Sequence, residues 1–198
     1  MIAFLEGGLV EKHPTHVIVD VQGVGYHVNI PLSSYESLEV VDGRVKLLTH
    51  LYVREDAMRL YGFSSVAERD LFELLIGVSG IGPPMALTIL SGIPIVDFKR
   101  LISAEDATGL TRIKGIGQKL AQRLVLEMKD KIGQISPEDF SPDAVGQADP
   151  DVLDEAAAAL SGLGANPVQA RKIVATVLQE MGDDAPIEEV IRRSLKSI

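Results

Sequence analysis

The sequence predicts a multidomain α+β protein: a small β-barrel, then a helical segment with an internal repeat, then a separate module of three helices. Three observations lead to this prediction. Up to residue 63, apolar and polar residues alternate in short runs, which is typical of β-strands. From residue 64 the apolar residues recur every three or four positions, as in helices. A polar stretch rich in turn-forming residues then precedes a last helical region.

Residues 1–63 contain five short β-rich runs separated by turn signals. The runs are Met1 to Leu5, Thr15 to Val21, Gly25 to Ile30, Val45 to Val53 and Met58 to Tyr61, and the turn signals are Gly7-Gly8, His13-Pro14, Gln22-Gly23 and Asp42-Gly43. Five short strands in a segment of this length indicate a closed barrel of the OB-fold type. An SH3-like barrel is the alternative, and the periodicity alone does not distinguish the two.

The helical segment is predicted to cover residues 64–132. Ser65 and Glu68 have the spacing of a capping box, directly before an apolar helical run. We expect residues 133–150, which are rich in Ser, Pro, Asp and Gly, to be a flexible linker. Helices are then expected at about 152–160, 168–181 and 187–196, and together they would form a compact C-terminal module over residues 151–198.

The net charge of −9 is distributed unevenly along the chain. Residues 1–63 hold five basic and eight acidic side chains, residues 64–133 nine and eight, and residues 134–198 five and twelve. An acidic chain argues against general affinity for nucleic acid, because phosphate binding requires Lys and Arg. Six basic side chains nevertheless gather within residues 112–131, so the middle segment keeps a local basic patch: Arg112, Lys114, Lys119, Arg123, Lys129 and Lys131.

Several classes of function are excluded or disfavoured by composition. The chain has no cysteine, which excludes disulfides, thiolate nucleophiles and cysteine-based zinc sites. The four histidines, His13, His16, His27 and His50, show no metal-ligand spacing, so we expect no metal site, and nothing indicates a cofactor. There is no P-loop. The N-terminus lacks the features of a secretory signal, and glycines and prolines interrupt the most apolar stretch, so we expect a cytoplasmic protein without a membrane span.

The middle segment contains a repeat that suggests anion binding. With an offset of 35 residues, Val78-Ser79-Gly80-Ile81-Gly82-Pro83-Pro84-Met85-Ala86 aligns with Ile113-Lys114-Gly115-Ile116-Gly117-Gln118-Lys119-Leu120-Ala121. The first Gly would take a positive φ at the end of a helix, the Ile would pack inward, and the second Gly would allow close approach of a foreign backbone. The next helix would then present free N–H groups, which hold a phosphate without reading a base.

The two copies of this repeat are not expected to bind equally. Pro83 and Pro84 remove two N–H donors from the first copy, and no cation lies between residues 78 and 90. The second copy has cations beside it, at Lys114, Lys119 and Arg123. We therefore expect the first hairpin to be the weaker phosphate site, with contacts made by its backbone or by a neighbouring subunit.

These motifs resemble those of the RuvA family. The two Gly-Ile-Gly elements look like tandem helix-hairpin-helix motifs, and further similar segments are Met1-Ile2, Gly23 to Tyr26, Val53 to Phe63 and Leu126 to Lys131. The resemblance implies an OB-fold domain (1–63), a tandem helix-hairpin-helix domain (64–132) and a mobile three-helix, UBA-like domain (151–198). It also implies a homotetramer, or an octamer, that holds a four-way (Holliday) DNA junction open in recombination and repair. The RuvB AAA+ ATPase and the RuvC resolvase would be its protein partners, and the chain itself would have no catalytic activity.

The candidate site residues follow from the repeat and from the resemblance. The predicted DNA contacts are Ser79, Gly80, Ile81, Gly82, Lys114, Gly115, Ile116, Gly117, Gln118, Lys119 and Arg123. The resemblance implies that Glu55 and Asp56 form an acidic pin that repels phosphates at the junction centre; by itself, such a pair would usually be a solvated turn. It also implies a motor-binding surface around Leu163, for which the candidates are Leu160, Leu163, Gly164 and Ala165.

Two other functions compete with this interpretation. Helix-hairpin-helix motifs also occur in DNA glycosylases and lyases, but such an enzyme needs a catalytic Asp or Lys beside a base pocket with apolar or aromatic walls. The chain has no Trp and only 5% aromatic residues. A barrel that binds single strands would need aromatic side chains on which the bases can stack. The barrel segment has few candidates for this role: Phe4, Tyr26, Tyr52 and Tyr61.

Overall fold

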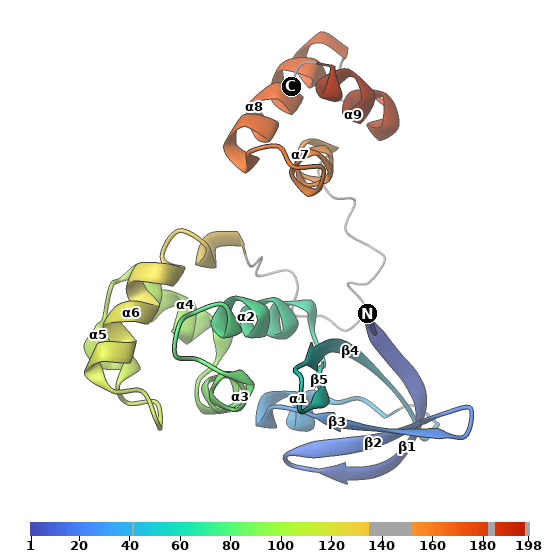
Figure 1. The fold of residues 1–198 in the computed structure, drawn as a ribbon, viewed down its shortest axis with the longest axis vertical. Helices are drawn as coiled ribbons and strands as arrows, with labels where there is room; N and C mark the ends of the chain where they lie inside the picture. Colours follow the sequence, from blue (N-terminus) through green and yellow to red (C-terminus); the bar gives the residue numbers. More distant parts are fainter. Residues whose placement is uncertain (41, 135–151, 182–184, 197–198) are drawn as a thin grey trace. The chain divides into compact units, whose positions relative to one another are not determined.

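The computed structural model describes residues 1–40, 42–134, 152–181 and 185–196, and it divides the chain into two units. The first unit contains the barrel and the helical hairpins, which share contacts, and the second contains three helices (Figure 1). Most of the predicted linker, residues 135–150, lies outside the described residues. Its first two residues belong to the short 3-10 helix η1 (Ile132–Gln134), whose Ile132 is buried in the core of the first unit.

The barrel has the strand order of an OB-fold. Its strands are β1 (Phe4–His13), β2 (His16–Val21), β3 (Val24–Asn29), β4 (Arg44–Val53) and β5 (Met58–Phe63). They close in the order β1-β2-β3-β5-β4, and β3 pairs with β5 in parallel while all other pairs are antiparallel. The parallel pair decides between the two predicted barrels in favour of the OB-fold, because consecutive hairpins alone would give only antiparallel neighbours.

Two details of the barrel differ from the sequence prediction. A short helix, α1 (Leu32–Ser37), follows β3 and was not predicted. The predicted turn at Gly7-Gly8 is wrong, because β1 continues through both glycines and pairs there with β4 on one side and β2 on the other. Gly7 is required by packing: a Cβ at this position would lie 2.1 Å from the backbone oxygen of Asp20. The glycine therefore marks a close approach of two strands.

A buried carboxylate connects the barrel to the first helix of the hairpin region, α2 (Val66–Ile76). Ser65 is the N-cap as predicted, and its Oγ accepts a hydrogen bond from the Glu68 N–H at 3.2 Å. In a capping box, the Glu side chain would accept a hydrogen bond from the N–H of the N-cap residue, Ser65. Here Glu68 Oε2 accepts instead from the N–H of Ser64, one residue earlier, at 3.1 Å. The same oxygen accepts from Ser64 Oγ at 2.9 Å and from Ser34 Oγ, on α1, at 2.6 Å. Glu68 thus joins α1 and α2.

Five further helices build the hairpin region around one apolar core. They are α3 (Pro83–Gly92), α4 (Ile95–Ser103), the four-residue α5 (Ala107–Leu110), α6 (Gln118–Met128) and η1. The core is continuous with the end of β5, where the Phe63 and Phe72 rings lie 4.9 Å apart. The helix before the second copy of the repeat is α5, which is only a single turn, whereas the first copy follows the longer α2. The shared core fixes the hairpins relative to the barrel.

The second unit contains α7 (Val152–Gly162), α8 (Pro167–Met181) and α9 (Ile187–Leu195), as the sequence predicts to within a few residues. Its core is made of small and branched side chains, among them Ala156, Leu160, Ala170, Val174 and Val190. Within the residues that the structure describes, every helix is too short or too polar to cross a membrane.

Candidate nucleic-acid interface

The two Gly-Ile-Gly turns adopt the conformation that the repeat predicts. Gly80 and Gly115 have φ values of +92° and +89°, so both end a helical segment in a region that favours glycine. Ile81 and Ile116 are 5% and 4% exposed and belong to the common core. Their N–H groups donate to Val78 and Ile113 oxygens at 3.0 and 3.1 Å. Both isoleucines, predicted as DNA contacts, thus use their side chains and N–H groups inside the protein.

The hairpins pack against each other through equivalent residues. A Cβ built on Gly115 would lie 2.8 Å from Met85 Cε of α3, and one built on Gly80 would lie 4.0 Å from Leu120 Cδ1 of α6. Met85 and Leu120 occupy equivalent positions of the repeat. Each second helix therefore covers the turn of the other hairpin, and the two turns belong to one surface.

The helices that follow these turns have no side-chain cap at their N-termini and offer different numbers of free N–H donors. Gly82 and Gly117 are the N-caps, and neither receives a side-chain capping bond. In α6 the first intrahelical bond runs from Ala121 to Gly117, which leaves three N–H groups in the first turn, on Gln118, Lys119 and Leu120. In α3 the first two positions are prolines, and only Met85 keeps a first-turn N–H. The predicted asymmetry in donors is present in the structure.

The first hairpin receives its cation from the second. Arg123, on α6, donates from Nη1 to the backbone oxygen of Ser79 at 2.9 Å, and its Nε lies 4.0 Å from Glu127 Oε1. Its side chain is half exposed, so the guanidinium lies at the first turn with donors facing solvent. The sequence assigned Arg123 to the second hairpin and expected the first to depend on its backbone or on another subunit. The packing of the hairpins brings Arg123 to the first turn as well, so its position differs from the one that the sequence order suggested.

A second cation approaches the first hairpin from the barrel. Arg54 lines a groove of about 520 Å³ together with Tyr52, Ile81, Gly82 and Pro83. Its Nε donates to Tyr52 Oη at 2.7 Å and its guanidinium lies 5.0 Å from the centre of the Tyr52 ring, which orients the side chain. The groove thus places an arginine of the barrel beside the open N-terminus of α3.

Among the other basic side chains of the region, Lys129 is engaged in an ion pair. It bonds to Glu105, which follows α4. The hydrogen bond and the charge of Lys129 lower the pKa of Glu105, and Glu105 raises the pKa of Lys129 in turn. Lys114 and Lys119 are both exposed beside the second turn. They remain the principal candidates for phosphate contacts there.

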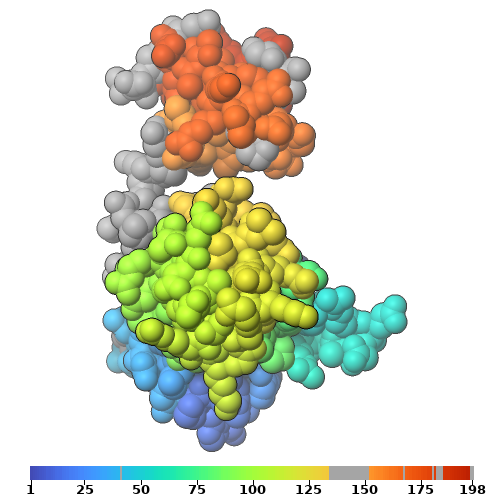
Figure 2. All heavy atoms as spheres, turned by 90° about the vertical axis from the view of Figure 1, so that its left-hand side faces the viewer, coloured from blue at the N-terminus to red at the C-terminus, as the bar shows by residue number. Residues whose placement is uncertain are grey.

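Glu55 and Asp56 form the tip of the β4–β5 hairpin and are exposed. Arg54 and Ala57 close the loop, with an N–H to oxygen bond of 2.8 Å from Arg54 to Ala57. Figure 2 shows the connection between these strands as a turquoise arm that projects from the body of the first unit. None of the ion pairs found among the described residues involves either carboxylate. The arm therefore presents two charges to solvent.

Comparison with known protein families accounts for all three segments. Residues 1–62 match the family described as "RuvA N terminal domain", residues 72–130 match "SAM-like Helix-hairpin-helix tandem", and residues 151–198 match "RuvA, C-terminal domain". The chain belongs to the RuvA family. A relative from Thioalkalivibrio sulfidiphilus (strain HL-EbGR7), named "Holliday junction branch migration complex subunit RuvA", is 43% identical over 201 residues, which cover 100% of this chain and 98% of that protein.

Two further relatives carry the same name. The one from Marinomonas sp. (strain MWYL1) is 42% identical over 200 residues, and the one from Methylococcus capsulatus (strain ATCC 33009 / NCIMB 11132 / Bath) is 40% identical over 201 residues; both alignments cover 100% of this chain and 98% of the relative. The similarity therefore extends through the barrel, the hairpins and the C-terminal unit.

In the C-terminal RuvA domain, the four candidate partner residues have different environments. Leu160 is 0% exposed and is a core residue, so its side chain is not accessible to a partner without unfolding; this corrects its assignment. Ala165 is half buried against the same core, and Gly164 turns the chain with φ of +100°. Leu163 is 66% exposed, and Val168, which the sequence analysis did not select, is 69% exposed. The apolar surface here consists of Leu163 and Val168.

One cluster was missed by sequence reasoning altogether. Glu11, His13 and His16 lie together on the barrel, although the spacing of the histidines along the chain suggested no metal site. The signal that could have found them is the turn at Pro14, which predicts a hairpin and hence a cross-strand pair of His13 and His16.

Proposed function

We propose that this protein is a non-catalytic, structure-specific subunit that binds four-way DNA junctions and recruits a RuvB-type ATPase for branch migration in recombination and repair. The observation that carries the proposal is the pair of packed hairpins, in which the second helix of each covers the turn of the other. Together they present two helix N-termini, with Arg54 and Arg123 beside the first and Lys114 and Lys119 beside the second. Such a surface contacts phosphates at two places and reads no base.

The acidic arm supports a preference for junctions over continuous duplex. Glu55 and Asp56 would repel phosphates that approach the arm. This repulsion would lower the affinity for continuous duplex, whose phosphates would lie against the arm, more than the affinity for an open junction. An open junction, which has a central space between its arms, would avoid that cost. The pin role of the two carboxylates is thus part of the proposal.

A comparison of three DNA substrates tests the proposal directly. A four-way junction, a duplex and a single strand of equal strand length are titrated with the full chain in gel-shift assays at one salt concentration. We expect the junction to bind most tightly, without base excision or strand cleavage. Equal affinity for junction and duplex would contradict the proposal, and excision of a base would favour the repair-enzyme alternative.

Variants of the arm isolate the effect of its charge. Glu55→Gln combined with Asp56→Asn removes two negative charges and keeps the shape of the loop, so duplex binding should become tighter while junction binding changes less. The salt titration of the same variant should show that the gain is largest at low salt, where charges are least screened. Unchanged duplex affinity would reject the pin.

The phosphate contacts are tested by the salt dependence of junction binding. Removing Lys119 and Arg123, each by substitution with Ala, should lower the slope of log K against log salt by roughly one per lost phosphate contact. Arg100→Ala is the matched control, because Arg100 is an exposed arginine of α4 that pairs with Asp97 and is not a predicted ligand. A slope that is the same in all variants would exclude Lys119 and Arg123 as ligands.

Recruitment of the motor is proposed to use the exposed apolar surface of the C-terminal unit. Leu163→Ala should weaken pull-down of a RuvB partner without changing junction binding, because an exposed leucine contributes to an interface and not to the fold. Leu126→Ala, which changes a leucine that is 80% exposed on α6, serves as the control. Equal loss of motor binding in both variants would contradict the assignment.

We also propose that the protein is cytoplasmic and acts as a homotetramer, with an octamer as the alternative, and that a RuvC resolvase joins the same junction. The proposal rests on membership in the RuvA family. Light scattering of the purified chain, alone and with a junction, distinguishes a monomer, four copies and eight copies by mass. A monomer in the presence of a junction would contradict it.

A further inference from the structure

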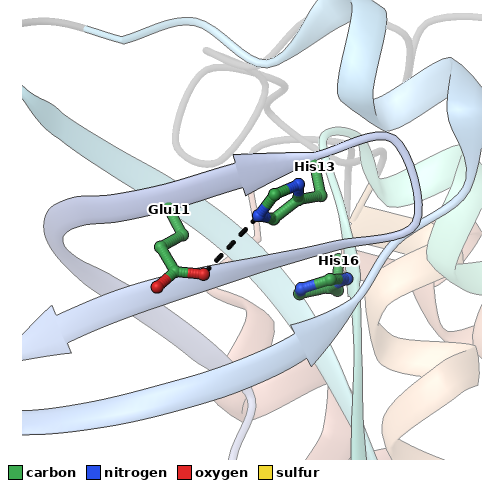
Figure 3. A group of neighbouring side chains, drawn as sticks. All are labelled: Glu11, His13 and His16. Atoms are coloured by element: carbon green, nitrogen blue, oxygen red, sulfur yellow. Dashed lines mark ion pairs between the residues drawn. The ribbon is translucent and has the colours of Figure 1, made fainter.

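The hairpin of β1 and β2 gathers three potential metal ligands on the outer face of the barrel. His13 and His16 are paired across a two-residue turn, and Glu11 lies two residues before His13 on β1. One ligand atom from each of the three side chains lies within 4.8 Å of the other two, and Glu11 Oε2 lies 3.6 Å from His13 Nε2 (Figure 3). Glu11 and His13 are exposed, and His16 is half buried.

A β-bulge brings these side chains to one face. In β1, Leu5 and Gly7 are buried, so simple alternation would direct Glu11 and His13 inward as well. The register shifts between Leu9 and Glu11, because Val10 has no partner on β2, and the side chains beyond it change faces. Glu11 and His13 consequently lie outside the barrel, with His16.

The surroundings of the cluster suit a cation. His16 Nδ1 lies 3.1 Å from Thr15 Oγ1; in the tautomer whose Nδ1–H donates to this hydroxyl, Nε2 carries the free lone pair that can bind a metal. The His16 ring stacks on His13 at 4.8 Å and on His27 at 4.6 Å between centroids, which restrains its rotation. Lys12 would oppose a bound cation, but it faces the other side, with Nζ 4.7 Å from the centre of the Tyr35 ring.

We propose that Glu11, His13 and His16 bind a divalent transition-metal ion of the Zn²⁺ type. Two imidazole nitrogens and one carboxylate oxygen are a donor set for Zn²⁺, Cu²⁺ or Ni²⁺, whereas Mg²⁺ and Ca²⁺ require more oxygen ligands. Binding of one ion would require the exposed Glu11 and His13 side chains to rotate, because the three ligand atoms lie up to 4.8 Å apart. Water completes the coordination. The ion would join β1 to β2 across the turn and so stabilise this hairpin of the barrel.

Calorimetric titration of the full chain with ZnCl₂ tests the site. The protein must carry no polyhistidine tag and must be freed of metal first; since the chain has no cysteine and four histidines, few other residues can bind Zn²⁺ tightly. We expect one Zn²⁺ per chain, and binding at least about tenfold weaker after His13→Ala or His16→Ala. Glu11→Gln should also weaken binding, because it replaces a carboxylate by a neutral amide.

His50 provides the matched control. Its Nδ1 lies 2.9 Å from Glu73 Oε1, so it is a histidine beside a carboxylate that lacks a second histidine. His50→Ala should bind Zn²⁺ like the parent chain. Far-UV circular dichroism of each variant without metal shows whether the barrel is intact. Where a variant fails to fold, nuclear magnetic resonance of the unaltered chain decides: Zn²⁺ should shift the ring signals of His13 and His16 and leave those of His50 in place.

Three results would overturn the proposal. The first is absence of Zn²⁺ binding by the parent chain at millimolar metal. The second is binding that His13→Ala and His16→Ala leave unchanged in folded protein. The third is equal perturbation of the His50 ring and the cluster rings, which would indicate adventitious binding to surface histidines.

Discussion

Gly115 and Gly117 lie on either side of Ile116 in the second hairpin, but substitution by alanine should affect them very differently. Gly115 has φ of +89°, and a Cβ at this position would lie 2.8 Å from Met85 Cε. Gly117 has φ of −87°, and a Cβ there would have no atom within 4 Å. We expect Gly115→Ala to destabilise the first unit and Gly117→Ala to leave its stability unchanged.

The size of the effect follows from two contributions. A residue with a Cβ costs roughly 1–2 kcal/mol in the left-handed region. The Met85 methyl group is the end of a flexible side chain and can move aside, so the overpacking adds only about 1 kcal/mol. The free energy of unfolding should therefore fall by about 2–3 kcal/mol. At roughly 2–4 °C per kcal/mol for a chain of this size, the Tm falls by roughly 4–12 °C.

Thermal denaturation followed by far-UV circular dichroism measures this difference, since the chain has no tryptophan for fluorescence. All variants are compared at one protein concentration, because self-association makes Tm depend on concentration. Gly80→Ala is an internal standard: its φ of +92° gives the same backbone cost, but the nearest atom to its Cβ, Arg123 Nη1, is at an ordinary 3.6 Å. It should lose about 1–2 kcal/mol.

The reasoning would be refuted if Gly115→Ala and Gly117→Ala had the same Tm. A second measurement separates folding from binding. Under the proposed function, Gly117→Ala places a methyl group in front of the first-turn N–H groups of α6, so it should weaken junction binding at unchanged stability. Full junction affinity in this variant would show that no backbone approaches that position closely.

Three further predictions concern the barrel, the contact between α1 and α2, and an exposed ion pair. Gly7→Ala should lower the free energy of unfolding, measured by urea denaturation, by at least about 3 kcal/mol or abolish folding, because its Cβ would lie 2.1 Å from a backbone oxygen of β2. Gly8→Ala is the control: its Cβ has open space around it, so its stability should stay within about 0.5 kcal/mol of the parent. Equal effects of the two substitutions would be inconsistent with the strand packing. Glu68→Ala should cost roughly 2–4 kcal/mol, since it removes the acceptor of three hydrogen bonds at the α1–α2 contact, and a loss below about 1 kcal/mol in the same assay would contradict that role. Lys129→Gln should raise the pKa of Glu105 toward its ordinary value in an NMR titration, and an unchanged pKa would show that the pair does not form. Because pairing lowers this pKa, the stabilisation of the fold by the pair is present at neutral pH and is lost as the pH falls through the pKa of the folded state.

The sequence predicted the local structure of this chain well, for identifiable physical reasons. Alternation of apolar residues follows from the two-residue period of a strand, and the three-to-four spacing from the helix. The positive φ of Gly80 and Gly115 and the buried Ile81 and Ile116 follow from the geometry of a tight turn between packed helices. Ser65 was found as an N-cap because its hydroxyl accepts from an amide only three residues away.

Where the sequence analysis failed, contacts between distant residues decide the structure. Gly7 looked like a turn residue, but it lies in mid-strand because another strand passes too close for a Cβ. Arg123 was assigned to the nearest hairpin in sequence, but the face-to-face packing carries it to the backbone of Ser79. Leu160 looked like part of a partner surface and is a core residue, because the three helices close over it.

By itself, then, the sequence determined the succession of a five-stranded barrel, a hairpin region and three C-terminal helices, the conformation of the two Gly-Ile-Gly turns and the unequal number of N–H donors at the helices that follow them. These properties depend on backbone geometry within a few residues. Only the tertiary structure decided which cations lie near the first hairpin, and only it brought Glu11, His13 and His16 together through a single unpaired residue in β1. Charge and ligand placement depend on pairing and packing across the chain, and no local pattern of residues encodes them.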